Sequence, residues 1–193
     1  LSLSAVVTSH FILQVPLSLG FDDVKEIISP CDGFNPLDRS GGVTDWPVAG
    51  SSVMVLSTHL NVMWEFNAAL LSDIAAGTPT WRPITLQLAQ QGVGSFCEPQ
   101  IPGPREWVGL DAVLQIIQHA PDGALYQCAA IRFQDLPFAG PDPSCMNDTG
   151  IAAQWIGGTT TSTSSSVTLP ASSSSTSETT SSTTGTTTTT TTT

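Results

Sequence analysis

Positive charge is scarce in this sequence. Its 193 residues include five lysines and arginines against 16 aspartates and glutamates, which gives a formal net charge of −11 at pH 7, and Lys25 is the only lysine. Nucleic acids and anionic lipids bind proteins through clusters of basic side chains, so this balance argues against both as partners. An acidic surface attracts cations, although net charge by itself does not define a binding site.

The sequence also lacks the residue patterns of common hydrolases and of zinc sites. No Ser-His-Asp order and no pair of catalytic carboxylates stands out. The adjacent acids Asp22 and Asp23 lie in a segment that is typical of a solvated turn. The spacing of the four cysteines fits no zinc-binding pattern, so a thiolate metal site is not expected.

The first residues have the composition of a processed leader. Residues 1–9 form an apolar run that closes on small residues, which is typical of the end of a secretory signal peptide cut after Ser9. The run has no initiator methionine and no basic residues, so we expect the sequence to be clipped at its start. A mature protein cut at this point begins with His10.

The last residues are almost wholly serine and threonine. This composition predicts a solvated, disordered and O-glycosylated stalk over residues 157–193. A glycosylphosphatidylinositol anchor needs a hydrophobic tail after such a stalk, so anchoring requires a chain that continues beyond Thr193. We therefore expect one folded domain over residues 10–156, located outside the cell, at its surface or wall.

Four cysteines in a secreted chain normally form two disulfides. The sequence alone allows three pairings of four cysteines. Of these we favour Cys97–Cys128 together with Cys31–Cys145. The sequon Asn147-Asp148-Thr149, just before the stalk, predicts N-glycosylation at Asn147.

The middle of the chain has the pattern of short strands separated by turns. The clearest candidates are residues 11–16, 52–59, 61–71, 84–88, 111–119 and 124–133. The last two flank Pro121-Asp122-Gly123, a strong turn signal, so they predict a hairpin. About seven such strands with few helix signals predict an all-β fold, an antiparallel β-sandwich of immunoglobulin or fibronectin III-like shape.

Three histidines are present, and His10 is the unusual one because it follows the predicted cleavage site. An N-terminal histidine chelates a metal through its α-amine and a ring nitrogen. A second imidazole completes a T-shaped set of three nitrogens, the histidine brace, which suits the tetragonal preference of Cu(II). His59 supplies that imidazole if its strand end lies at the same pole as His10. If cleavage falls elsewhere, His10 is an ordinary strand residue, and His119, before the turn, is expected to be exposed.

Several stretches taken together resemble a known family. They are residues 10–16 (HFILQVP), 19–23 (LGFDD), 30–34 (PCDGF), 44–48 (TDWPV) and 123–129 (GALYQCA). They resemble a fungal family of lytic-polysaccharide-monooxygenase-like copper proteins, of the copper acquisition factor type, which is not known for cleaving polysaccharide. The plan of that family is also similar: a signal peptide, a mature N-terminal histidine, two disulfides, and a Ser/Thr-rich tail that often carries a membrane anchor.

The resemblance implies that His10 and His59 are the two brace histidines. It also implies an aspartate ligand on the strand after Tyr-Gln-Cys, where this sequence carries Ala130. Loss of an anionic ligand leaves more positive charge on the bound metal, which favours Cu(I) over Cu(II). Asp122 in the adjacent turn is an alternative ligand.

Three functions remain open from the sequence. The resemblance favours a non-enzymatic, cell-surface protein that binds one copper ion, Cu(II) or Cu(I), per domain for copper uptake or homeostasis. Its expected partners are the copper ion and a cell-surface copper transporter, and we expect a monomer whose globular domain does not insert into the membrane. The alternatives are a copper-dependent polysaccharide monooxygenase and a metal-free structural or adhesive wall domain.

Overall fold

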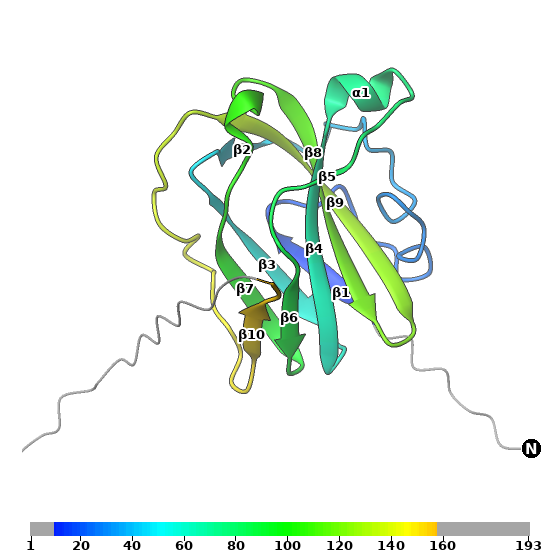
Figure 1. Ribbon diagram of the computed structural model, residues 1–193. Helices are drawn as coiled ribbons and strands as arrows, with labels where there is room; N and C mark the ends of the chain where they lie inside the picture. Colours follow the sequence, from blue (N-terminus) through cyan, green and yellow to red (C-terminus); the bar gives the residue numbers. More distant parts are fainter. Residues whose placement is uncertain (1–9, 158–193) are drawn as a thin grey trace, which may run out of the picture. The chain divides into compact units, whose positions relative to one another are not determined.

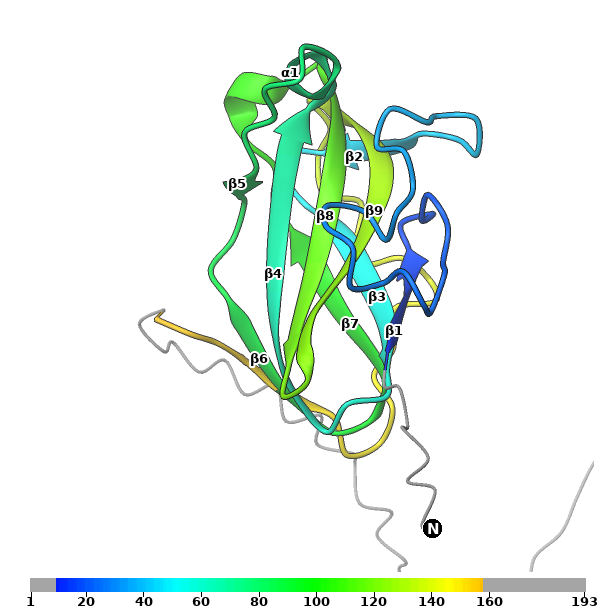
Figure 2. The same ribbon diagram turned by 90° about the vertical axis from the view of Figure 1, so that its right-hand side faces the viewer.

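A computed structural model describes residues 10–157, and its strands form two packed sheets (Figures 1 and 2). The predicted signal remnant, residues 1–9, lies outside the described residues, as does the predicted stalk from residue 158 onward. The strands are β1 (Phe11–Val15), β2 (Thr44–Pro47), β3 (Ser51–Ser57), β4 (Asn61–Leu70), β5 (Arg82–Pro83), β6 (Leu88–Gln91), β7 (Gly94–Ile101), β8 (Asp111–Ala120), β9 (Gly123–Gln134) and β10 (Ala152–Trp155). Two short helices, α1 (Leu71–Ala75) and the 3-10 turn η1 (Arg105–Trp107), connect them.

The two sheets differ in size. The smaller has the strand order β1-β3-β7, and the larger has the order β10-β6-β4-β8-β9-β2, with β5 also paired to β4. This arrangement confirms the predicted all-β sandwich. One pair, β2 with β9, is parallel, which the sequence analysis did not predict. Within the described residues, no helix has the length and apolar character needed to cross a membrane.

The core lies between the two sheets and is rich in aromatic side chains. Trp46 and Trp64 are fully buried. Trp64 satisfies its ring N–H by donating to Gln90 Oε1 at 2.8 Å, so its burial leaves no unpaired donor. The ring of Trp64 also meets Phe11 of β1 edge-on, with the ring centroids 5.1 Å apart. The first strand of the domain is therefore fixed in the core from its first residue.

The strand predictions are confirmed where the signal is local. The Pro-Asp-Gly turn joins β8 to β9 as predicted, and residues 61–70 form a strand. The prediction of a strand over residues 84–88 is wrong except at its last residue. Pro83 pairs with Asn67 and Leu88 pairs with Trp64. The chain therefore advances five residues from Pro83 to Leu88 while the paired strand β4 advances only three. The extra residues must leave the sheet, and β6 begins only at Leu88.

The predicted disulfide pairing is wrong. The bonds are Cys31–Cys128 and Cys97–Cys145, not Cys97–Cys128 and Cys31–Cys145. On β9, Ala129 faces the core between the sheets, whereas Cys128 faces the opposite side and packs with Val113 and Cys31. Cys97 belongs to the other sheet, so the side chain of Cys128 points away from it.

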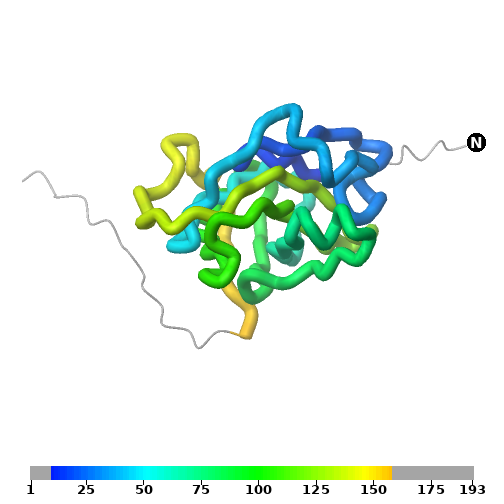
Figure 3. The backbone as a smooth tube through the Cα atoms, turned by 90° about the horizontal axis from the view of Figure 1, so that it is seen from above, coloured from blue at the N-terminus to red at the C-terminus, as the bar shows by residue number. Residues whose placement is uncertain are grey.

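The start of β1 and two connections meet at one end of the sandwich. Figure 2 shows the start of β1, the β3–β4 connection and the β8–β9 turn at this end, which is lowest in the view. The long connection from β1 to β2 lies on one side of the molecule and the 135–150 segment on another, drawn in blue shades and in yellow in Figure 3. This end of the sandwich carries His10 and His59.

Candidate metal centre

The pairing of β1 with β3 places His10 beside the residue that precedes His59. Phe11 is opposite Ser57 in the antiparallel ladder, so the next pair is His10 with Thr58. The Thr58 N–H donates to His10 O at 3.1 Å, and the His10 N–H donates to Thr58 Oγ1 at 2.8 Å. The condition set by the sequence is therefore met, because the two strand ends lie at the same pole.

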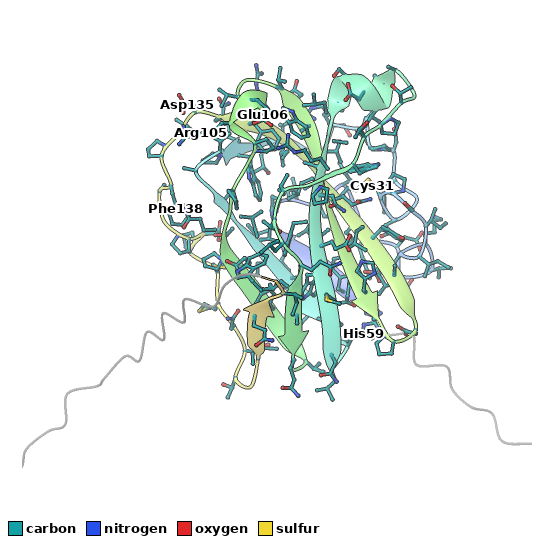
Figure 4. All side chains as sticks on the ribbon, viewed as in Figure 1. Cys31, His59, Arg105, Glu106, Asp135 and Phe138 are labelled. Carbon is teal, nitrogen blue, oxygen red and sulfur yellow. A yellow bond between two sulfur atoms is a disulfide. The ribbon has the colours of Figure 1, made fainter. Side chains whose placement is uncertain are left out.

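His59 is held by the turn of the β8–β9 hairpin. Its Nε2 lies 2.8 Å from Asp122 Oδ1, and its ring is only 7% exposed, whereas the Asp122 side chain is 56% exposed. Figure 4 labels His59 at the end where this hairpin turns. The structure therefore brings the proposed alternative ligand Asp122 to the predicted ligand His59.

One ring nitrogen of each of the two histidines, Nδ1, lacks a protein partner in the described part of the chain. His10 Nδ1 and His59 Nδ1 are buried and make no hydrogen bond among the described residues. A buried polar atom without a partner is rare and costly, so each needs an explanation. For His10 Nδ1 a metal ion is a natural one, because this nitrogen and the backbone nitrogen of the same residue are the chelating pair of a terminal histidine. The residues present therefore fit a copper ion.

The ring of His10 is also fixed by an aromatic contact. It packs against Phe21 from the β1–β2 connection, with the ring centroids 5.6 Å apart and the planes 53° apart. Among residues 10–157, no cluster of three or more His, Cys, Asp or Glu side chains is placed to hold a metal. The candidate centre therefore depends on the backbone nitrogen of His10 as a third donor beside two imidazoles.

Two other residues considered from the sequence lie outside this centre. Ala130 is buried in the middle of β9, opposite Val113. It is eight residues beyond Asp122, which corresponds to roughly 25 Å along an extended strand, so it lies far from the hairpin turn beside His59. His119 places its Nε2 3.2 Å from Glu65 Oε1, with 41% of its side chain exposed. Its ring pairs with a neighbouring strand rather than with His59.

Sequence reasoning missed the groups that fix the outer edge of β1. Glu26, 1% exposed, accepts from the Phe11 N–H and from Gln127 Nε2, each at 3.1 Å. Gln127, fully buried, also accepts from the Leu13 N–H at 3.0 Å and donates to Phe11 O at 2.5 Å. These two side chains replace a neighbouring strand along the free edge of β1. We name them the Glu26–Gln127 clamp.

Burial has a marked effect on two carboxyls of the β1–β2 connection. It raises the pKa of Glu26 from 4.5 to about 7, and the hydrogen bonds from Gln127 and Phe11 offset only part of the rise. Burial likewise raises the pKa of Asp32 from 3.8 to about 6, although Asp32 Oδ2 accepts the Asp22 N–H at 2.8 Å. Both carboxyls therefore tend to hold a proton in the folded protein at mildly acidic pH.

The fold is a β-sandwich that carries two histidines at one end, and the sequence is similar to a lytic polysaccharide monooxygenase-like protein. The chain belongs to the copper acquisition factor BIM1-like family, which matches residues 8–150. It is 30% identical over 162 residues to an uncharacterized protein of Aspergillus fumigatus, covering 79% of this chain and 65% of that protein. It is 28% identical over 164 residues to the lytic polysaccharide monooxygenase-like protein X325 of Yarrowia lipolytica, covering 80% of this chain and 60% of that protein. The chain thus spans less than two thirds of the length of these relatives.

Proposed function

We propose that this protein, once cut after Ser9, is an extracellular copper-binding protein with a histidine brace that serves copper uptake or homeostasis. The observation that carries the proposal is the convergence of His10 and His59 at one end of the sandwich. A buried, unpartnered Nδ1 on His10 and a carboxylate beside His59 Nε2 support it. Membership of a copper acquisition factor family supports copper as the metal.

Each donor has a defined part in the proposed centre. Cleavage after Ser9 converts the His10 backbone nitrogen into an α-amine, which chelates together with Nδ1 of the same residue. His59 Nε2 would be the third nitrogen once its hydrogen bond to Asp122 Oδ1 is given up and the ring proton is held on Nδ1, and Asp122 then adds a negative charge beside it. Protons compete with copper for the amine and both imidazoles, so we expect the affinity for Cu(II) to fall steeply between about pH 7 and pH 4.5. An unchanged affinity over that range would contradict the brace.

The composition of residues 1–9 and 157–193 supports export from the cell and a place at the cell surface. Membership of a copper acquisition factor family supports a cell-surface copper transporter as the partner. Asn147 suits N-glycosylation because its Oδ1 accepts from the Cys97 N–H at 2.7 Å, which leaves Nδ2 available for a glycan. We expect a monomer that binds one copper ion.

The surface around the centre supports copper handling rather than cleavage of polysaccharide. Enzymes that oxidise a sugar chain usually present exposed aromatic rings beside the copper, on which the sugar stacks. The five tryptophans of this chain are all buried or half-buried. The aromatic ring that contacts His10 is Phe21, which is 39% exposed; it is a single, smaller ring that packs on the histidine itself.

The first test is to purify the mature protein from a secreting host, sequence its N-terminus and titrate it with Cu(II) under electron paramagnetic resonance. We expect a free His10 terminus, one copper per protein and nitrogen hyperfine structure. His59→Ala should lose the hyperfine pattern, and the matched control His119→Ala should keep it. A shifted terminus without stoichiometric copper would overturn the proposal, and oxidised oligosaccharides released with a reductant would overturn its non-enzymatic part.

A further inference from the structure

The hydroxyl of Thr58 contacts both backbone groups of His10. Thr58 Oγ1 lies 2.8 Å from His10 O and 2.8 Å from His10 N. A hydroxyl carries one proton, so if it donates that proton to the carbonyl oxygen it can only accept at the nitrogen. The Thr58 N–H adds a second bond to His10 O at 3.1 Å. Thr58 therefore holds the first residue of the mature chain through three hydrogen bonds.

We propose that Thr58 is a positioning residue of the copper centre, whose hydroxyl orients the His10 α-amine toward the metal. This inference rests on the proposed function. A free amine rotates about its N–Cα bond and has one lone pair for the metal. When one of its N–H bonds points at Thr58 Oγ1, that rotation is restricted before copper arrives. Ordering the ligand in advance lowers the entropy lost on binding, as outer-sphere hydrogen bonds do at other metal sites.

The rest of β1 needs no help from this hydroxyl. Phe11 is fully buried, and the Glu26–Gln127 clamp occupies its N–H and its C=O on the outer edge of the strand. The Thr58 side chain, in contrast, is on the exposed part of the β3–β4 connection. Loss of the hydroxyl should therefore change the orientation of the amine without changing the strand or the core.

The test uses the mature protein that begins at His10. Thr58→Val keeps the branched shape and the backbone N–H but removes the hydroxyl, whereas Thr58→Ser keeps the hydroxyl. We would measure Cu(II) affinity by competition with a chelator, the electron paramagnetic resonance spectrum, and the urea midpoint without copper. We expect Thr58→Val to weaken Cu(II) binding by about 10- to 100-fold. The nitrogen hyperfine pattern of Thr58→Val should change, whereas its urea midpoint should not. Thr58→Ser should keep the Cu(II) affinity and the spectrum of the unchanged protein.

The outcomes separate this inference from the proposed function. If the unchanged protein binds no stoichiometric copper, the brace and the role of Thr58 both fall. If it binds copper but Thr58→Val binds equally tightly with the same spectrum, only the role of Thr58 is overturned. A loss that Thr58→Ser does not restore also overturns it, because the hydroxyl is then not the cause. Thr58→Ala provides a second variant without the hydroxyl should Thr58→Val fold poorly.

Discussion

Replacing Glu26 by glutamine should remove a loss of stability at neutral and alkaline pH. The burial of Glu26 raises its pKa from 4.5 to about 7, so the folded state holds the proton more tightly than the unfolded chain does. The resulting contribution to the free energy of unfolding is complete below the unfolded value and is lost as pH rises through the folded value. At about 1.36 kcal/mol per pKa unit, the loss is about 3 kcal/mol, nearly all of it between about pH 4 and pH 8.

The glutamine mimics the neutral form of the carboxyl. Its Oε1 can still accept from the Phe11 N–H and from Gln127, so the Glu26–Gln127 clamp keeps its acceptor. Urea unfolding with the disulfides intact should show similar stabilities for Glu26→Gln and the unchanged protein at about pH 4. At about pH 8 the variant should be more stable by about 2 to 3 kcal/mol.

Two details make this comparison selective. Burial also raises the pKa of Asp32 to about 6, so its ionisation likewise lowers the free energy of unfolding as pH rises, but Asp32 is present in both proteins. Glu106→Gln is the matched control, because the hydrogen bond from Arg82 lowers the pKa of this exposed carboxyl, so its removal should not raise the stability at about pH 8. Equal slopes of stability against pH for Glu26→Gln and the unchanged protein would refute the reasoning.

Three further predictions concern the centre, the disulfides and the core. Asp122→Asn removes the negative charge beside His59 Nε2, so chelator competition should show Cu(II) affinity about 10-fold weaker; unaltered affinity would exclude Asp122 from the centre. Replacing Cys31 and Cys128 together by serine removes a disulfide between residues 97 apart in sequence, which should lower the free energy of unfolding in urea by about 4 to 5 kcal/mol. Peptide mapping of the unchanged protein should find Cys31 bonded to Cys128. Trp64→Ala should cost about 3 to 5 kcal/mol in the same unfolding assay, and a cost below about 1 kcal/mol would contradict its place in the core.

Local signals predicted the hairpin and the long strands, whereas the disulfides needed three-dimensional information. The turn at Pro121-Asp122-Gly123 is encoded by adjacent residues and could be predicted. The pairing of Cys128 could not, because β9 is buried on both faces from Gln127 to Ile131 and shows no alternation of polar and apolar residues. Without that alternation, the sequence does not indicate which side of the sheet each residue faces.

The candidate centre was predictable only in part for a similar reason. His10 was identified by its position after the predicted cleavage site, whereas His59, at a predicted strand end, was assigned as a ligand through the family resemblance. The contacts of Thr58 and Glu26 depend on pairings 48 and 15 residues apart in sequence, and no spacing rule specifies them. Thr58 had one weak signal, its place next to His59. Glu26 had none, since a glutamate in a turn-rich connection is normally solvated.

The clamped edge of β1 has a consequence for how long a terminal histidine survives among secreted proteases. An aminopeptidase must draw the first few residues of its substrate, extended and unpaired, into its cleft. In a chain that begins at His10, the next residue is fully buried, paired to β3 on one side and bonded to Glu26 and Gln127 on the other. Trimming therefore requires β1 to leave the sandwich, so the loss of His10 would report detachment of this strand rather than fraying of the end.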